Sequence, residues 1–177
     1  DGGASRQASS ASGIAAIADD QAMVLVHDAV RPLLNHATIN RCLDALETFD
    51  AVDTGIPSPD TIIRVDQHGC IDEIPDRAAL RMGQTPQGFR AGLLRKAHAL
   101  AAADAELKVT DDCGLILHYQ LAAVRVVEGD VSNIKITYPS DIYLADRLFQ
   151  LRTRPFSSDS MVRPLEGKIL VVFGASR

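Results

Sequence analysis

The feature that most constrains the fold is an alternation of apolar runs, which suit buried strands, with segments that have the spacing of amphipathic helices. Residues 23–27 form a continuous apolar run that ends at a histidine, as expected for a strand covered on both faces. Apolar residues then recur at three- and four-residue steps in residues 36–49, the spacing of a helix with one buried face. Strands that alternate with helices predict right-handed crossovers and a mostly parallel, three-layer α/β sheet.

Other segments extend this pattern along the chain. Further helices are predicted at residues 9–18, capped by Ser9 or Ser10, and at 89–103, 111–119 and 139–151, and further strands at 51–57, 122–128 and 133–137. Residues 61–65 and 70–74 flank a turn that ends at Gly69, which predicts a β-hairpin arm. Residues 152–164 mix Arg, Ser and Pro without periodicity, which indicates a linker before an isolated apolar strand at 168–173.

Composition and charge disfavour several classes of protein. The 177 residues include 18 basic and 23 acidic side chains, for a formal charge of -5, so the chain offers no positive surface for nucleic acid. No apolar run reaches the roughly 18 residues of a membrane span, and the N-terminal segment lacks the features of a signal peptide. Three cysteines without a CxxC pair argue against disulfides and structural zinc. We therefore expect a cytoplasmic protein with neither nucleic acid nor membrane as a partner.

Two polar positions near expected strand ends are candidates for chemistry, because ligands of open parallel sheets bind outside the carboxyl ends of strands. Asp28 and Arg31 follow residues 23–27. The carboxylate suits a divalent metal or a sugar hydroxyl, and the guanidinium suits a phosphate. The alternative is a structural ion pair that closes a loop.

Lys135 is the second candidate, because it interrupts the apolar strand expected at 133–137. A buried ammonium needs an anionic partner, either a carboxylate or a substrate phosphate. The alternative is a lysine that snorkels from an edge strand.

Three further polar segments carry weaker signals. Residues 1–9 place two glycines before a helix start, whose amides and capping hydroxyl suit a nucleotide, although flexible chain ends share this composition. Residues 83–87 and 110–113 each lie next to an expected helix start, and a helix cap is the default explanation for Thr110. The sequence contains no His/Glu zinc pattern, serine elbow or Walker loop, which disfavours hydrolases and P-loop proteins.

Taken in order, six motifs resemble those of the cytidylyltransferases that make CDP-linked sugar alcohols. They are GGxxRxxS, HDAVRP, the hairpin bounded by Asp60-Thr61 and Arg77, TPQ, TDD and NIKIT. The resemblance covers about residues 1–151 and implies a Rossmann-like nucleotidyltransferase sheet with a protruding arm. It further implies transfer of CMP from CTP to a sugar-alcohol phosphate, with Mg²⁺ as the cofactor.

The resemblance also implies roles for individual residues. Three of them match the segment that lies against the cytosine of CTP: Gly3, Arg6 and Ser9. Asp28 and Arg31 match a pair that faces the sugar phosphate and the metal, with Asp28 as the metal ligand. Lys135 matches a lysine that meets the substrate phosphate, so Lys135, Asp28 and Arg31 are the expected catalytic residues.

The remaining matched residues are expected to bind the sugar phosphate. Thr61 and Arg77 match arm positions that reach into the site of a neighbouring subunit, which implies a homodimer. Thr85, Thr110 and Asp111 match positions that line the substrate site.

One departure from the family pattern concerns the triphosphate. Family members begin with a strand and a glycine-rich loop, containing Arg and Lys, that cradles the CTP triphosphate, and no such segment stands before Asp1. If these residues are all there is, we therefore expect a poor enzyme; equally, the segment could have been cleaved or omitted from a longer protein. The alternative is a non-catalytic nucleotide-binding or dimerisation module.

Two features favour D-ribitol 5-phosphate as the acceptor over methylerythritol 4-phosphate, the substrate used in isoprenoid-precursor synthesis. The segments RAALRMGQTPQ and TDDC look more like ribitol-phosphate enzymes. Residues 165–177 resemble the first strand and glycine turn of a short-chain dehydrogenase, although any buried strand followed by a turn has this pattern. We therefore expect a transferase domain at 1–151, a linker at 152–164 and the start of a reductase domain at 165–177. NADPH would serve only that downstream domain.

Overall fold

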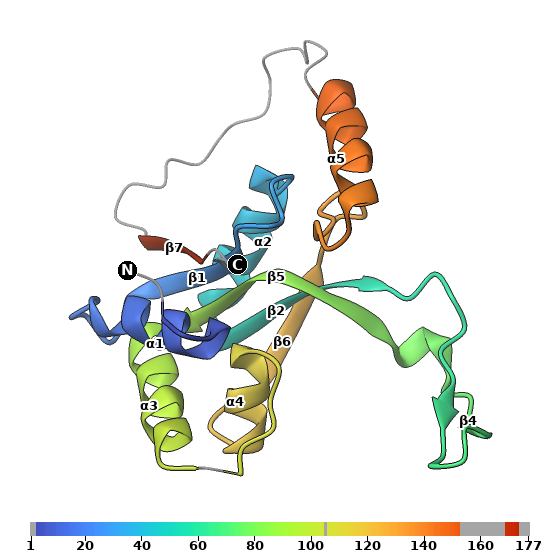
Figure 1. Cartoon of the computed structure of the whole chain (residues 1–177). Helices are drawn as coiled ribbons and strands as arrows, with labels where there is room; N and C mark the ends of the chain where they lie inside the picture. Colours follow the sequence, from blue (N-terminus) through green and yellow to red (C-terminus); the bar gives the residue numbers. More distant parts are fainter. Residues whose placement is uncertain (1–2, 105, 153–168, 174–177) are drawn as a thin grey trace.

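A five-stranded sheet organises the chain, which a computed structural model describes over residues 3–104, 106–152 and 169–173 (Figure 1). The strands are β1 (Met23–Asp28), β2 (Ala51–Pro57), β5 (Arg81–Arg90), β6 (Val124–Glu128) and β7 (Ile169–Phe173), in the order β6-β2-β5-β1-β7. β1 pairs in parallel with β7, and β2 pairs in parallel with β6. β5 runs antiparallel to both β1 and β2. Four strands therefore share one direction, and the prediction of a mostly parallel sheet is confirmed.

Helices cover both faces of this sheet, which confirms the three-layer arrangement (Figure 1). α2 (His36–Leu46) lies on one face, and α1 (Arg6–Ala15), α3 (Ala91–Ala102) and α4 (Asp112–His118) lie on the other. Val24 and Val26 belong to the apolar cluster beneath the three helices, whereas Leu25 belongs to the cluster beneath α2. Residues 23–26 are therefore apolar throughout because successive side chains of β1 are buried on opposite faces.

α5 (Pro139–Arg152) is attached differently from the other helices. It extends away from the sheet (Figure 1), and Ala145 is its one buried residue. No helix in the described ranges is both long enough and apolar enough to cross a bilayer.

The arm predicted from the hairpin pattern is present, with shorter strands than expected. β3 (Arg64–Val65) and β4 (Ile71–Glu73) pair in antiparallel fashion, and the turn between them places Gly69 at a φ of +81°. The short helix η1 (Arg77–Ala79) returns the chain to β5. Every residue from 61 to 74 is exposed, so the arm stands out from the sheet (Figure 1).

β5 is the strand that the sequence pattern did not predict. Residues 83–87 read as a polar segment ahead of a helix, whereas they form the middle of β5, and 84–87 are buried. Hydropathy conceals this strand because its buried side chains include polar ones that find polar partners. Gln87, for example, donates from Nε2 to Asp53 Oδ1 and to Asp111 Oδ2, at 3.1 Å each.

Residues 133–137 were wrongly predicted to be a strand. They form an irregular segment that is held by a hydrogen bond of 2.8 Å from the N–H of Ile136 to the carbonyl of Val30. The side chain of Lys135 is 48% exposed. The argument that this lysine is buried inside an apolar strand is therefore wrong.

The helices α1 and α3 begin at residues that differ from the predicted ones. α1 begins at Arg6, and the Ser5 side chain caps it by accepting from the N–H of Ala8. Ser9 and Ser10 are therefore buried positions within α1 and not its caps. α3 begins at Ala91, because the residues before it complete β5.

The predictions for the C-terminal part concern residues that the structure describes only in part. Residues 153–168 and 174–177, which include most of the expected linker, lie outside them. The strand expected at 168–173 is present as β7 (Ile169–Phe173), at the edge of the five-stranded sheet beside β1. The prediction that this strand opens a reductase domain stays a prediction.

Candidate active site

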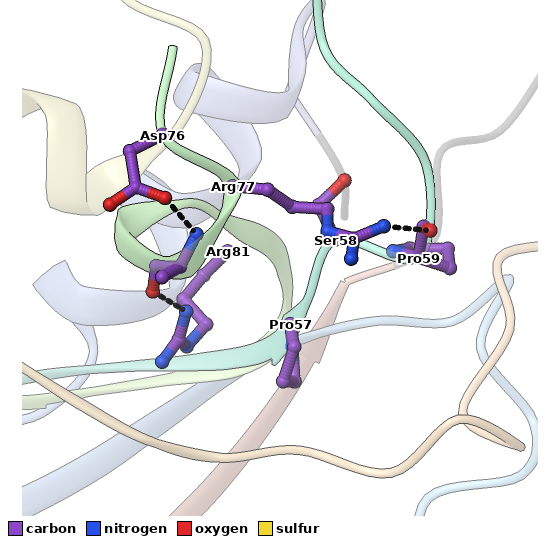
Figure 2. A pocket seen from close by; sticks show the side chains of 7 residues that line it. Pro57, Ser58, Pro59, Asp76, Arg77 and Arg81 are labelled. Carbon is purple, nitrogen blue, oxygen red and sulfur yellow. Dashed lines mark hydrogen bonds between the residues drawn. The ribbon is translucent and has the colours of Figure 1, made fainter.

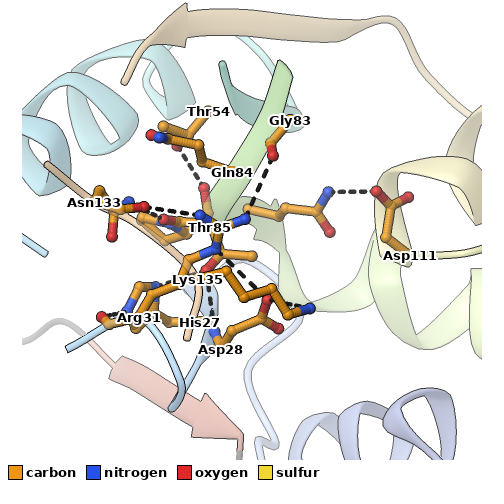
Figure 3. A network of polar contacts seen from close by, with 12 residues as sticks. His27, Asp28, Arg31, Thr54, Gly83, Gln84, Thr85, Asp111, Asn133 and Lys135 are labelled. Carbon is orange, nitrogen blue, oxygen red and sulfur yellow. Dashed lines mark hydrogen bonds and ion pairs between the residues drawn. The ribbon is translucent and has the colours of Figure 1, made fainter. Parts of the chain in front are cut away.

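Asp28 lies at the carboxyl end of β1 among three cationic side chains. Its Oδ1 is 3.5 Å from Arg6 Nε, and its Oδ2 is 3.3 Å from Lys135 Nζ and 3.7 Å from Arg31 Nε. Only 14% of the Asp28 side chain is exposed, so water screens these charges less than it would at an open surface. The structure thus brings together Asp28, Arg31 and Lys135, the three residues expected to be catalytic (Figure 3).

The turn after β1 fixes the position of Arg31. Its N–H donates to the carbonyl of Asp28 at 2.9 Å. Its guanidinium donates from Nη1 to the carbonyl of Asn133 at 2.8 Å, so part of Arg31 serves the structure, as the alternative interpretation held. Burial lowers the pKa of Arg31, and the Asp28 carboxylate opposes this effect. The Nη1 of Arg31 is therefore hydrogen-bonded to the protein backbone, while its Nε faces the Asp28 carboxylate.

His27 and Thr85 lie behind this turn (Figure 3). His27 Nδ1 is 2.8 Å from Thr85 Oγ1, and His27 Nε2 is 3.0 Å from the carbonyl of Arg31. Thr85 Oγ1 also accepts from the N–H of Asp28 at 3.0 Å. Burial lowers the pKa of His27, which favours the neutral imidazole. Thr85, which was expected to line the substrate site, therefore contacts the Asp28 cluster through the backbone N–H of Asp28.

Arg6 links Asp28 to a buried carboxylate on α4. Its Nη1 donates to Asp112 Oδ2 at 3.0 Å, and Asp112 Oδ1 lies 3.1 Å from His98 Nε2. Burial by itself would raise the pKa of Asp112, but the hydrogen bond with His98 and the charge of Arg6 hold it below its ordinary value. Asp112 therefore acts as a fixed anion that orients Arg6.

Gln87 joins two more carboxylates next to Arg6. Through the bonds described above it contacts Asp53 and Asp111. Burial, with the nearby Asp111 charge, raises the pKa of Asp53 to about 6. Asp111 is also the N-cap of α4, because its Oδ1 accepts from the N–H of Gly114 at 2.7 Å. Thr110 is exposed and does not cap the helix, which corrects the default explanation.

The residues expected to contact cytosine lie around the start of α1. The N–H of Gly3 donates to Ser9 Oγ at 2.9 Å. A Cβ at Gly3 would lie 2.5 Å from the Cβ of Ala8, so a side chain at this position would displace the helix. Arg6 lines a small pocket with Thr110, Asp111 and other residues of the 109–112 segment. Five of the expected binding residues, Gly3, Arg6, Ser9, Thr110 and Asp111, thus lie close together, since Gly3 and Ser9 brace the turn that carries Arg6.

The two arm residues are not part of this cluster in a single chain. Thr61 is exposed on the arm, which extends away from the sheet (Figure 1). Arg77 donates from Nη1 to the carbonyl of Pro59 at 3.2 Å, and with Asp76 and Arg81 it lines an open pocket of about 670 Å³ (Figure 2). A second subunit would be needed to bring these residues to an Asp28 cluster.

The described residues fit Mg²⁺ only in part. Within them, no three His, Cys, Asp or Glu side chains gather around a point where a metal ion fits. Asp28 supplies a carboxylate, but three cations already face it. Mg²⁺ is commonly held by one or two carboxylates together with substrate phosphates. Asp28 therefore fits Mg²⁺ as a single protein ligand that needs the phosphates of a nucleotide to complete the site.

Comparison with known proteins assigns the family. The profile of the IspD family, described as 2-C-methyl-D-erythritol 4-phosphate cytidylyltransferase, matches residues 1–151. The chain belongs to the IspD family. This confirms the resemblance inferred from the six motifs.

Relatives of this IspD-family chain include enzymes named for two different acceptors. A 2-C-methyl-D-erythritol 4-phosphate cytidylyltransferase of Thermobifida fusca is 46% identical over 156 residues, which cover 84% of this chain and 63% of the relative. The bifunctional ribulose 5-phosphate reductase/CDP-ribitol pyrophosphorylase Bcs1 of Haemophilus influenzae is 38% identical over 183 residues, which cover 99% of this chain and 38% of the relative. The chain therefore spans less than two thirds of the length of either relative.

Solved structures of the IspD family share the fold. The 4-diphosphocytidyl-2C-methyl-D-erythritol synthase of Anaerococcus prevotii matches with a TM-score of 0.79 at 35% identity, covering 84% of this chain and 68% of that one. The 2-C-methyl-D-erythritol 4-phosphate cytidylyltransferase of Thermus thermophilus matches with a TM-score of 0.74 at 37% identity, covering 85% of this chain and 72% of that one. The expected nucleotidyltransferase fold is thus confirmed.

Several residues around the site of this IspD-family chain were given no role of their own by the sequence analysis, although three of them lie within the quoted motifs. They are His27, Asp53, Gln87, His98 and Asp112. His27 ends the apolar run of β1, and Asp53 lies within β2. A polar residue in a buried strand needs a polar partner, so the sequence could have indicated both as candidates. The role of His98 could not be predicted from the sequence, because its partner Asp112 is on another helix.

Proposed function

We propose that this chain is the transferase part of an enzyme that transfers CMP from CTP to D-ribitol 5-phosphate, giving CDP-ribitol and pyrophosphate. The observation that carries the choice of acceptor is the extent of similarity to the Haemophilus influenzae protein. That alignment covers 99% of the chain and so includes residues 169–173, whereas the alignment with the Thermobifida fusca enzyme covers 84%.

The presence of a second fused domain in the Haemophilus influenzae protein does not by itself explain why its alignment covers more of this chain. The bifunctional IspD/IspF enzyme of Bradyrhizobium diazoefficiens also carries a second activity in its name, yet its alignment covers 86% of this chain. The additional similarity therefore favours a reductase half after the transferase, as the strand and glycine turn at 165–177 predicted. A reductase that makes ribitol 5-phosphate would supply the acceptor for the transferase.

Methylerythritol 4-phosphate is the second candidate acceptor. The Thermobifida fusca relative named for this substrate is 46% identical, against 38% for the CDP-ribitol pyrophosphorylase. Greater identity over the transferase region supports this alternative.

The Asp28 cluster supports in-line transfer between two phosphates. An oxygen of the acceptor phosphate forms a bond to the α-phosphorus of CTP, and the bond from that phosphorus to the bridging oxygen of pyrophosphate breaks. The attacking oxygen is already anionic, so the step needs no strong base. Charge neutralisation and positioning are what the protein must provide.

Lys135, Arg31 and Arg6 are the cations of this chain that would neutralise the phosphates. Asp28 keeps the three near one point by its contacts of 3.3 to 3.7 Å. Mg²⁺, when bound with the nucleotide, would withdraw charge from the phosphates, and Asp28 is the residue that would hold it.

We also propose that the arm docks on a second copy of the chain. Its exposed side chains include several apolar ones: Ile62, Ile63, Val65, Ile71 and Ile74. A two-stranded hairpin cannot bury such residues by itself. Docking would carry Thr61 and Arg77 to the partner's substrate, where Arg77 would pair with its phosphate.

Pyrophosphate release by the full-length gene product tests these alternatives. With CTP and each acceptor in turn, we expect kcat/KM for D-ribitol 5-phosphate to exceed that for methylerythritol 4-phosphate by at least about tenfold, or about 1.4 kcal/mol. Polar groups near Asp28 and Arg77 would give this preference by pairing with acceptor hydroxyls. An equal or reversed preference would assign the enzyme to isoprenoid-precursor synthesis. No release with either acceptor would favour a non-catalytic module.

A further inference from the structure

His27 and Thr85 form a buried hydrogen-bonded pair that no step of the proposed transfer uses directly. The histidine is 5% exposed and the threonine 5% exposed. They lie on neighbouring strands, β1 and β5, immediately behind the turn that carries Asp28 and Arg31 (Figure 3). A buried polar pair at this place must have a defined set of donors and acceptors.

The partners of His27 determine where its hydrogen lies. Its Nε2 is 3.0 Å from the carbonyl of Arg31, which can only accept, so Nε2 carries the hydrogen. In the neutral ring Nδ1 is then an acceptor, and the hydroxyl of Thr85 donates to it at 2.8 Å. The same hydroxyl oxygen accepts from the N–H of Asp28 at 3.0 Å. The donor and the acceptor of each hydrogen bond in this set are therefore determined.

We propose that His27 is a positioning residue, which acts through Thr85 and the carbonyl of Arg31 to fix the turn that presents Asp28 and Arg31. The proposal rests on the proposed transfer, because the turn matters through the phosphates it would face. The hydroxyl hydrogen of Thr85 is committed to His27 and is not available to a substrate. Thr85 then serves the site by holding the Asp28 backbone, in place of the direct substrate contact that the family resemblance implied.

The same pair is joined to the segment that carries Lys135. The carbonyl of Thr85 accepts from Asn133 Nδ2 at 2.7 Å, and Asn133 is fully buried. The carbonyl of Asn133 in turn accepts from Arg31 Nη1 at 2.8 Å. A substitution at His27 or Thr85 should therefore affect the positions of Asp28, Arg31 and Lys135, around which the transfer would take place.

The first test reads the tautomer of His27 directly. In full-length protein labelled with ¹⁵N-histidine, two-bond ¹H–¹⁵N correlation spectra should show His27 with its hydrogen on Nε2, with the signal assigned by its loss in His27→Gln. The same tautomer should persist when CTP and an acceptor phosphate are added. A hydrogen on Nδ1, or a switch of tautomer on adding substrate, would overturn the proposal, because Thr85 would then be free to donate elsewhere.

The second test separates positioning from general stability by kinetics. Thr85→Val keeps the shape and removes the hydroxyl, so kcat should fall by about 10- to 100-fold while KM for CTP changes by less than about threefold. Thr85→Ser, which restores a hydroxyl, should recover most of the lost kcat. Thr48→Val makes the same chemical change at an exposed threonine beyond α2 and provides the matched control.

A double variant tests whether His27 and Thr85 act as a unit. The loss in His27→Gln/Thr85→Val should be at least about threefold smaller than the product of the losses in the two single variants. Losses that multiply fully would mean that the residues act independently, which would overturn the proposal. His36→Gln, at an exposed histidine of α2, is the control for the histidine change.

The outcomes for this pair and for the proposed function are distinguishable. If neither acceptor yields pyrophosphate, the proposed function fails, while the tautomer spectrum still tests the hydrogen-bond set. If transfer occurs and Thr85→Val retains a normal kcat, the positioning role fails while the function stands.

Discussion

The ammonium of Lys135 lies 3.3 Å from Oδ2 of Asp28, yet 48% of the lysine side chain remains exposed. Asp28 is 14% exposed and also faces Arg6 and Arg31. Lys135 is thus held at the open edge of the cluster, where its charge keeps much of its hydration. From this position the ammonium can leave the Asp28 carboxylate and pair with an oxygen of a substrate phosphate without any rearrangement of the core.

Lys135→Ala should therefore impair chemistry without harming the fold. In the full-length protein we expect CMP transfer to fall by at least about 10²-fold, because a cation that stabilises phosphate charge is removed. The unfolding transition should stay within about 0.5 kcal/mol of wild type, since the side chain is half exposed. Lys96→Ala, at an exposed position of α3, is the matched control. Near-normal turnover in the Lys135 variant would remove it from the site.

The arm predicts self-association through its apolar side chains. Sedimentation of the full-length protein at micromolar concentration should show a dimer, and Ile63→Glu together with Ile71→Glu should shift it toward monomer. Both isoleucines are more than half exposed in one chain, so the folding of the monomer should tolerate the change. Gln67→Glu adds charge to the same arm without removing apolar surface. A strict monomer for the wild type would rule out the arm-mediated dimer.

Asp53 predicts a pH dependence of stability. Its pKa is raised from 3.8 to about 6 in the folded protein, so between these values the folded state holds more protons than the unfolded state. Stability contributed by this group is therefore lost as pH rises through about 6. Asp53→Asn cannot ionise but keeps an oxygen for Gln87, so its advantage over wild type should grow with pH to at most about 3 kcal/mol.

Urea unfolding at pH 4.5 and pH 7.5 measures the Asp53 effect. The advantage of Asp53→Asn over wild type should be larger at pH 7.5 than at pH 4.5 by about 2 kcal/mol, because most of the ionisation of Asp53 in the folded state occurs between these two values. Asp50→Asn, at an exposed carboxylate before β2, should show no such change. The same difference at both pH values would mean that Asp53 is not protonated preferentially in the folded state.

Asp112 predicts a link between the core and nucleotide binding. It is 1% exposed and pairs with Arg6 and His98. Asp112→Asn keeps the size but removes the charge, so the free energy of unfolding should fall by about 1 to 3 kcal/mol. Because Arg6 loses an anchor, CTP should bind more weakly by about tenfold in calorimetry of the full-length protein. Unchanged CTP affinity would show that Asp28 alone orients Arg6.

Local patterns predicted most of the elements that carry the site. β1, β2, α2, α4 and α5 were predicted with bounds close to those observed, because each has a continuous apolar run, an amphipathic period or a clear start signal. The arm was predicted from its turn. Asp28 and Arg31 were singled out because they follow a buried strand.

Lys135 was singled out by an argument that the structure corrects. It was expected to be buried in a strand and is half exposed in an irregular segment. Its pairing with a carboxylate still holds, because the segment is tied to the turn after β1 by the bond from Ile136 to Val30. No local pattern encodes a tie between residues so far apart in the chain.

The sequence by itself determined the fold class, the arm and the family, and it singled out Asp28, Arg31 and Lys135, since periodicity and motifs can be read directly along the chain. Only the tertiary structure decided that β5 inserts antiparallel between β1 and β2. That insertion brings Thr85 to His27, and Gln87 to Asp53 and Asp111. The physical reason is that buried polar residues are stable only with partners from other segments, so their burial depends on long-range contacts that hydropathy does not report.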